Sequence, residues 1–227
     1  MKPLRVAILG GSFNPPTIAH MEMGNKILAD QKADKLLFVP CGERPDKPEL
    51  IEGSHRLNML AIDIASSFRI APRLVKSDRP AAFEVPQKIL IDDYELRVYR
   101  KLMPTALLIQ HFERRFPDVR FKFVMGSDLL ETIRSWEFYD EVLRSREYLV
   151  FERDTHAISD FELPGRSEVL ADPSLNNISS TKVRQLLAQR EQRAGEIDPQ
   201  MVQQLKQFIN NDVLNYIVKN DLYLPRN

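Results

Sequence analysis

Short, continuously apolar runs recur along the chain, with helical patterns between them. A strand with one solvated face alternates apolar and polar residues, so continuous runs are typical of strands that are covered on both faces. Strands that alternate with helices in this way predict an α/β fold with a doubly wound, mostly parallel sheet. The runs are RVAILG at 5–10, KLLFVP at 35–40, FKFVMG at 121–126 and EYLVF at 147–151, with FRIAP at 68–72 as a weaker candidate.

The order of these patterns also predicts how the chain is divided. Two apolar stripes at helical spacing follow the first two strands, and the last 50 or so residues carry helical stripes alone. Between them, a mixed segment with prolines at both ends is interpreted as an insertion or cap that is partly helical. We therefore predict an α/β domain over residues 1–175 with an insertion at about 76–103, and a small C-terminal helical subdomain over 176–227.

The composition argues against several kinds of partner and site. Lys+Arg and Asp+Glu both number 32, so no global field draws the chain to nucleic acid or to an anionic membrane, and any phosphate site must be local. No apolar stretch approaches the roughly 20 residues of a membrane span, and the N-terminus is too short for a signal peptide, so a cytoplasmic protein is expected. Cys41 is alone and the four histidines are scattered, which argues against an internal disulfide and a zinc cluster.

The stretch VAILGGSFNPPTIAH at 6–20 joins the first strand to the first helix. It is not a Walker loop, because no Gly-Lys-Ser/Thr follows the glycines, and Ser12 and Asn14 break the Gly-x-Gly-x-x-Gly spacing. Glycines let a phosphate approach the backbone, and the N–H groups at a helix start favour negative charge. Thr17 and His20 share one side of the first helical turn, so both can meet one phosphate. The alternative is a tight turn with a capping threonine and a solvated histidine.

A second stretch, ISSTKVR at 178–184, has the same chemistry near the other end of the chain. Ser179 and Ser180 are natural N-caps of the helix that follows, so hydroxyls and free N–H groups gather at its positive end. Lys182 and Arg184 add full charges where a triphosphate would lie. The alternative is a capping box with exposed basic residues.

These two stretches resemble the paired signatures of the nucleotidyltransferases with a (His/Thr)-x-x-His motif. Many members have His-x-Gly-His, whereas this chain has Thr17 and Ala19 in the first and third places. The resemblance implies a Rossmann-like nucleotidyltransferase fold and covers most of the chain except about 76–103. Three further segments resemble the nicotinate and nicotinamide mononucleotide adenylyltransferases: RPDKPELIEGSHRLNML at 44–60, FVMGSDLLETIRSWEFYDEVL at 123–143 and DVLNYIVKNDLY at 212–223.

The resemblance assigns the phosphates of ATP to the two signatures. His20 would contact α- and β-phosphate oxygens, and Thr17 would supply a neutral donor where other members have a second histidine. Lys182 and Arg184 would hold the β- and γ-phosphates with the helix start beside them. The ATP-binding residues implied are Gly10, Gly11, Ser12, Phe13, His20, Gly126, Asp128, Ser179, Ser180, Thr181, Lys182 and Arg184, with Thr17 as a further catalytic residue.

The acceptor half of the site matches the family less closely. Trp136, the only tryptophan, would stack on a pyridine ring, and PTALLIQHFERRFPD aligns with the family's acceptor loop through Thr105. As alternatives, Trp136 could be a core aromatic residue, Lys47 a solvated charge and Asp128 a helix N-cap. No metal ligand is assigned, and the acceptor-binding residues implied are Ser12, Phe13, Lys47, Thr105 and Trp136.

The reaction implied is attack by the 5′-phosphate of a nicotinate or nicotinamide mononucleotide on the α-phosphorus of ATP, which releases pyrophosphate. The attacking phosphate is already largely dianionic at neutral pH, so no general base is needed. Mg²⁺ would travel with the triphosphate. Alternatives are another phosphorylated acceptor such as phosphopantetheine, CTP as donor, or a non-catalytic nucleotide-binding regulator. The sequence leaves open whether the pyridine carries an acid or an amide, and whether the chain forms a homo-oligomer.

Overall fold

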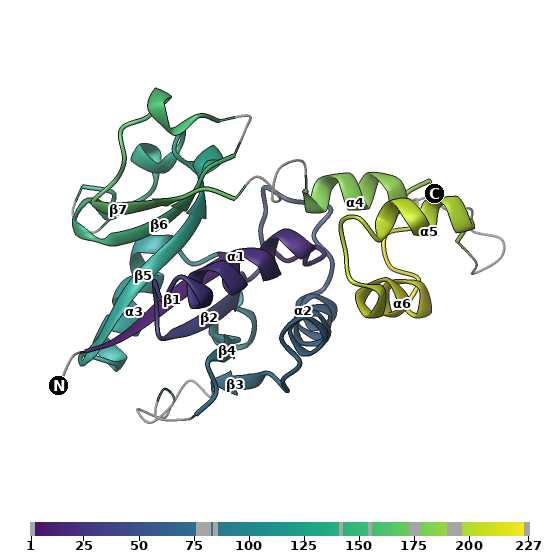
Figure 1. The fold of residues 1–227 in the computed structure, drawn as a ribbon, viewed down its shortest axis with the longest axis horizontal. Helices are drawn as coiled ribbons and strands as arrows, with labels where there is room; N and C mark the ends of the chain where they lie inside the picture. Colours follow the sequence, from purple (N-terminus) through teal and green to yellow (C-terminus); the bar gives the residue numbers. More distant parts are fainter. Residues whose placement is uncertain are drawn as a thin grey trace.

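A central parallel sheet organises the chain (Figure 1). The computed structural model describes residues 3–75, 83, 86–140, 143–153, 156–172, 178–189 and 197–224. Within them the sheet is 7-stranded, in the order β3-β4-β2-β1-β5-β6-β7, and every neighbouring pair is parallel. The predicted doubly wound parallel sheet is confirmed. The strands are β1 (Leu4–Gly11), β2 (Lys35–Pro40), β3 (Arg73–Val75), β4 (Ile89–Asp92), β5 (Val119–Gly126), β6 (Glu147–Phe151) and β7 (Arg166–Leu170).

The four clear apolar runs form β1, β2, β5 and β6, whereas the weaker prediction at 68–72 is wrong. The helix before it continues to Phe68 and ends at Arg69, whose φ of 53° is left-handed, so the strand begins only at Arg73. The interpretation of the segment at about 76–103 as an insertion is wrong for residues 89–92, because β4 lies between β2 and β3 in the sheet. Only 4 residues long, β4 gives too short an apolar run to stand out.

Helices cover both faces of the sheet, and alternate residues of β1 divide between the two cores. Val6 and Ile8 pack on the side of α3 (Thr105–Arg115). Ala7 and Leu9 pack on the opposite side, with α1 (Ile18–Ala29) and α2 (Gly53–Phe68), as the apolar stripes predicted. Shorter helical turns lie in the connections, at Glu95–Tyr99 (a π-helix), Ser127–Leu129, Ile133–Ser135, Leu143–Ser145 and Ile158–Asp160.

The chain ends in helices that share a third core beside the sheet (Figure 1). They are α4 (Ser180–Leu187), α5 (Pro199–Leu205) and α6 (Asn211–Lys219), and Met59 of α2 enters the same core. The predicted boundary at residue 175 lies outside the described residues. Among the residues that are described, no helix is both long and apolar enough to span a membrane.

Candidate active site

The strand order reverses at β1, which has β2 on one side and β5 on the other. In open α/β sheets, ligands bind beyond the carboxyl ends of the strands at this reversal. The loop from Ser12 to Thr17 lies at this place and leads into α1. Its Phe13 has a left-handed φ of 46° and is buried, with its ring centroid 5.0 Å from that of His20. The loop is therefore held in one conformation by packing against its own helix.

Thr17 and His20 meet at the start of α1, as their spacing predicted. The Thr17 N–H donates to His20 Nδ1 over 3.0 Å, and Thr17 Oγ1 lies 2.8 Å from the same nitrogen. A backbone N–H can only donate, so Nδ1 is an acceptor and a neutral ring carries its proton on Nε2. Burial, together with a smaller effect of the Arg153 charge, lowers the pKa of His20 to about 4. His20 is therefore a neutral N–H donor at pH 7, and buried Thr17 orients it.

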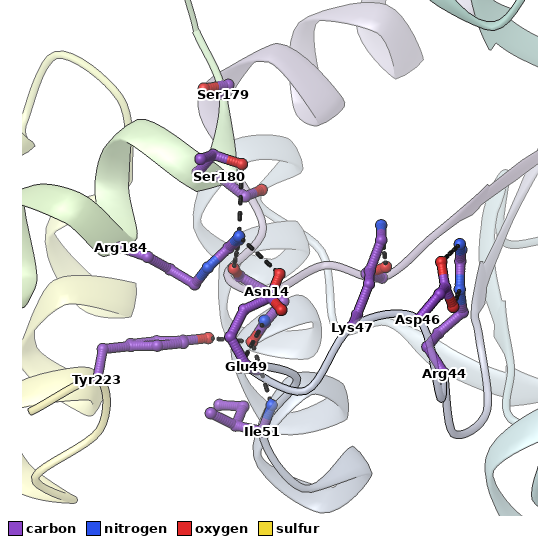
Figure 2. A network of polar contacts seen from close by, with 12 residues as sticks. Asn14, Arg44, Asp46, Lys47, Glu49, Ile51, Ser179, Ser180, Arg184 and Tyr223 are labelled. Carbon is purple, nitrogen blue, oxygen red and sulfur yellow. Dashed lines mark hydrogen bonds and ion pairs between the residues drawn. The ribbon is translucent and has the colours of Figure 1, made fainter. Parts of the chain in front are cut away.

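The two signature motifs come together although more than 160 residues separate them in sequence. The Ser180 hydroxyl donates to the Pro15 carbonyl over 2.7 Å. Arg184 Nη1 donates to the Asn14 carbonyl over 2.9 Å (Figure 2). The N-terminus of α4 is thus fixed against the loop that precedes α1. Two helix starts, an imidazole and a guanidinium meet at one end of the sheet, which is an arrangement suited to a chain of phosphates.

The two basic residues of α4 are placed differently. Arg184 reaches the first motif, whereas the Lys182 ammonium lies 4.7 Å from the centre of the Phe208 ring. Ser179 caps the helix, since its hydroxyl accepts the Lys182 N–H over 3.2 Å. Thr181 is exposed beside them. A phosphate contact for Lys182 stays a prediction, because this side chain would have to leave the Phe208 ring.

A third segment, the connection from β2 to α2, closes the site beside Ser12. Lys47 Nζ donates to the Ser12 hydroxyl over 3.3 Å. Arg56 is buried, and its guanidinium donates to the carbonyls of Ser12, Cys41 and Ile51 over 2.8, 2.9 and 3.1 Å. Arg56 therefore joins the β1–α1 loop to the β2–α2 connection, a role that its sequence position in a helix did not reveal.

Asn14 is the second residue that joins these segments, and the pattern analysis missed it. Its Oδ1 accepts from the Tyr223 hydroxyl over 2.8 Å, and its Nδ2 donates to the Glu49 carbonyl over 3.2 Å (Figure 2). An asparagine directly before two prolines was a usable sequence signal for Asn14. Tyr223 carried none, because it lies near the end of the sequence and far from either motif.

Residues 8–186 of the chain match the family described as cytidylyltransferase-like, which is most of the chain and spans both motifs. The chain belongs to this cytidylyltransferase-like family. A probable nicotinate-nucleotide adenylyltransferase of Lactococcus lactis subsp. lactis (strain IL1403) is 27% identical over 225 residues, 98% of this chain and 96% of that protein. One of Clostridium botulinum (strain Okra / Type B1) is 24% identical over 226 residues, 96% of this chain and 98% of that protein.

A solved structure agrees with these relatives. The nicotinic acid mononucleotide adenylyltransferase of Plasmodium falciparum, complexed with NaAD, superposes with a TM-score of 0.76 and 27% identity over 97% of each chain. The Rossmann-like nucleotidyltransferase fold expected from the resemblance is therefore confirmed.

Gly126 is the last residue of β5, and the side chains of Asp128 and Arg153 lie against its backbone. A Cβ at Gly126 would lie 2.2 Å from Asp128 Oδ1 and 2.7 Å from Arg153 Nε, so any larger residue would displace these two side chains. The two side chains form an ion pair over 3.0 Å. Arg153 lies two residues beyond the carboxyl end of β6 and was missed, although that position alone marks a candidate. The role of Asp128 in ATP binding stays a prediction.

The remaining acceptor residues lie on separate connections. Thr105 begins α3, and Trp136 follows the turn at Ile133–Ser135, partly buried against the core under α3. Trp136 Nε1 donates to the Thr132 hydroxyl over 3.2 Å. Their role in acceptor binding stays a prediction.

Glu95 links two of these connections and was also missed. Its Oε2 accepts from the N–H groups of Gly42 and Met103 over 3.2 and 3.1 Å, so it ties the loop after β2 to the segment before α3. Burial raises the pKa of this carboxyl to about 7. Among the described side chains, no group of three or more His, Cys, Asp and Glu is placed to hold a metal ion.

Proposed function

We propose that the chain transfers AMP from ATP to nicotinate mononucleotide and releases pyrophosphate. The observation that carries the proposal is the contact of Ser180 and Arg184 with the loop before His20, which gathers the phosphate-binding groups at one place. The names of the relatives and of the Plasmodium falciparum structure with NaAD support the acid form of the pyridine. We expect the reaction to occur in the cytoplasm, as for other steps of soluble nucleotide metabolism.

The chain's residues act by positioning and charge neutralisation. An oxygen of the acceptor's 5′-phosphate attacks the α-phosphorus of ATP, and the bond from that phosphorus to the β-phosphate oxygen breaks. Negative charge then develops on the departing pyrophosphate, where His20 Nε2–H, Arg184 and the N–H groups at the start of α4 would stabilise it. Lys182 would add positive charge from the same helix. Neutral His20 donates without giving up its proton, which suits a leaving group that needs none.

Mg²⁺ would enter with ATP and be held chiefly by phosphate oxygens and water. The groups gathered here are N–H and hydroxyl donors and a guanidinium, which bind phosphate oxygens and not a cation. These residues fit MgATP as a substrate and leave the coordination of the ion to the triphosphate.

The acceptor would lie on the Lys47 side of the loop. Lys47 is close enough to Ser12 to share an anion with it, so we assign both to the acceptor's phosphate. Phe13 and Thr105 would shape this end, and Trp136 would stack on the pyridine.

Turnover measured with ATP and nicotinate or nicotinamide mononucleotide in parallel tests the proposal, with pyrophosphate release as the readout. We expect release with the nicotinate compound, and a lower kcat/KM with the amide. Release only with phosphopantetheine, or only with CTP, would assign another acceptor or donor. Binding of ATP without release with any acceptor would make the chain a nucleotide-binding regulator.

A further inference from the structure

Arg184, the cation proposed for the triphosphate, already has an anionic partner within the protein. Its Nη2 donates to Glu49 Oε1 over 3.0 Å while its Nη1 donates to the Asn14 carbonyl (Figure 2). The guanidinium side chain is 19% exposed and the carboxylate side chain 46%, so the carboxylate is the partner that can turn into water. A phosphate that reaches Arg184 therefore competes with Glu49.

The backbone at Glu49 is held by contacts that do not use its carboxylate. Asn14 Nδ2 donates to the Glu49 carbonyl over 3.2 Å, and Tyr223 in turn fixes the Asn14 amide. The carboxylate can leave Arg184 while the peptide stays in place. Removing the charge at Glu49 thus changes the competition at Arg184 without releasing the loop.

We propose that Glu49 is a displaceable counter-ion of Arg184 and sets the selectivity of the site for nucleotides that carry a β- and γ-phosphate. The inference rests on the proposed ATP site. A terminal phosphate carries up to two negative charges against one on the carboxylate, so it displaces Glu49. A nucleoside monophosphate does not reach Arg184 and leaves the pair intact. After the reaction Glu49 returns to Arg184, which weakens the hold on pyrophosphate.

The opposite role is that Glu49 holds Arg184 in its binding orientation. The two roles differ in the sign of one measurement. If Glu49 competes, Glu49→Gln tightens the binding of ATP and pyrophosphate, because Arg184 loses a rival anion. If Glu49 positions Arg184, the same substitution weakens both.

The same loop offers a matched control. Asp46 pairs with Arg44 over 2.6 Å at the other end of the loop in Figure 2, away from Arg184. Asp46→Asn therefore removes one negative charge from the same loop without touching the proposed competition. An effect that comes only from removing a negative charge from this loop would appear in both Glu49→Gln and Asp46→Asn.

The experiment is calorimetric titration of the whole chain, wild type and both variants, with ATP, inorganic pyrophosphate and AMP. We expect Glu49→Gln to tighten ATP and pyrophosphate about two- to fivefold, the range of a partly exposed ion pair, with AMP unchanged. Asp46→Asn should change none of the three. Unchanged or weaker ATP binding in Glu49→Gln, or an equal gain for AMP or in Asp46→Asn, would overturn the inference.

Arg184→Gln separates this inference from the proposed function. If Arg184→Gln binds ATP and pyrophosphate as the wild type does, the proposed phosphate site is wrong. If it binds them more weakly but Glu49→Gln gains nothing, only the role of Glu49 is wrong. In the Arg184→Gln background, Glu49→Gln should have no effect on either ligand. Thermal unfolding of each variant verifies the fold, and Glu49→Ala repeats the test with a second neutral side chain.

Discussion

The junction between the β1–α1 loop and α4 is assembled differently from the region of the proposed acceptor residues. At the junction, two short segments provide all the groups, and they contact each other directly through Ser180 and Arg184. Phosphate recognition needs charge and backbone N–H groups, which a loop and a helix start supply within a few residues. A compact sequence motif is enough for this kind of site.

The proposed acceptor residues come from three connections instead. Lys47 lies between β2 and α2, Thr105 begins α3, and Trp136 follows β5. Glu95 ties the first two connections together through one carboxylate oxygen. Recognition of a flat ring and a sugar needs side chains from several directions. The connections that supply them are separate in sequence, so each can vary in length without the others. The difference predicts that substitutions at the junction act on catalysis and those in the acceptor region act on acceptor affinity or stability.

The largest effect is expected at the junction. His20→Ala should lower kcat about 100- to 1,000-fold, the range for losing a donor to developing charge. The free energy of unfolding should fall by no more than about 1 kcal/mol, the value of a lost capping contact. Steady-state pyrophosphate release and urea unfolding measure the two. His55→Ala is the control, since His55 Nδ1 contacts the Tyr216 hydroxyl away from the junction, and turnover retained in His20→Ala would reject the role.

The same difference explains how much of the fold and site could be predicted. The long apolar runs of β1, β2, β5 and β6 predicted the sheet, because burial on both faces leaves a pattern in a single strand. Short β4 could not be predicted in this way, since its 4 residues become a strand only between β2 and β3.

The candidate site shows the same difference between features that a short segment encodes and contacts between distant segments. The positions of Thr17, His20, Ser180 and Arg184 in or directly before two helices could be predicted because each motif is local, and their roles stay predictions. The contacts of Asn14 with Tyr223 and of Arg184 with Glu49 span 209 and 135 residues, and no local pattern encodes such a pairing. The sequence pattern also did not predict where a side chain points, as Lys182 shows by lying over the Phe208 ring.

In the acceptor region, Glu95 should make stability depend on pH. Its folded pKa is raised from the ordinary 4.5 to about 7 by burial, so the folded protein keeps a proton that the unfolded chain releases. The contribution of Glu95 to the free energy of unfolding is greatest below about pH 4 and is lost as pH rises through about 7. Glu95→Gln keeps an oxygen for both N–H groups and cannot ionise.

Urea unfolding of wild type and Glu95→Gln at pH 5 and pH 8 measures this effect. From pH 5 to pH 8, the free energy of unfolding of the wild type should fall by about 1–3 kcal/mol more than that of the variant. Buried Asp63, whose pKa burial raises to about 7, is present in both proteins and cancels in the comparison. Asp92, whose pKa burial raises to about 6, acts on Glu95 through its charge, so the measured difference belongs to the pair Glu95 and Asp92. A difference that is equal at both pH values would contradict the ionisation of Glu95.

A smaller effect is expected for Trp136. Trp136→Ala should raise the KM for the mononucleotide about tenfold, since stacking on a base is worth about 1–3 kcal/mol. The KM for ATP should stay within about twofold, and Trp136→Phe should recover most of the loss because it restores a ring. Steady-state kinetics with each substrate varied in turn makes the test. An equal rise in both KM values would assign Trp136 to the core against which it packs.

The smallest effect is expected for Lys182, which shares a helix with Arg184 but not its direction. Its ammonium lies over the Phe208 ring, and such a contact is worth about 0.5–1 kcal/mol at an exposed site. Lys182→Ala should therefore lower the free energy of unfolding by about that amount and raise the KM for ATP less than about threefold. Lys182→Met keeps the aliphatic stem and removes the charge. A KM for ATP raised tenfold or more in both variants would show that ATP draws Lys182 away from Phe208, and the junction would then use both basic residues of α4.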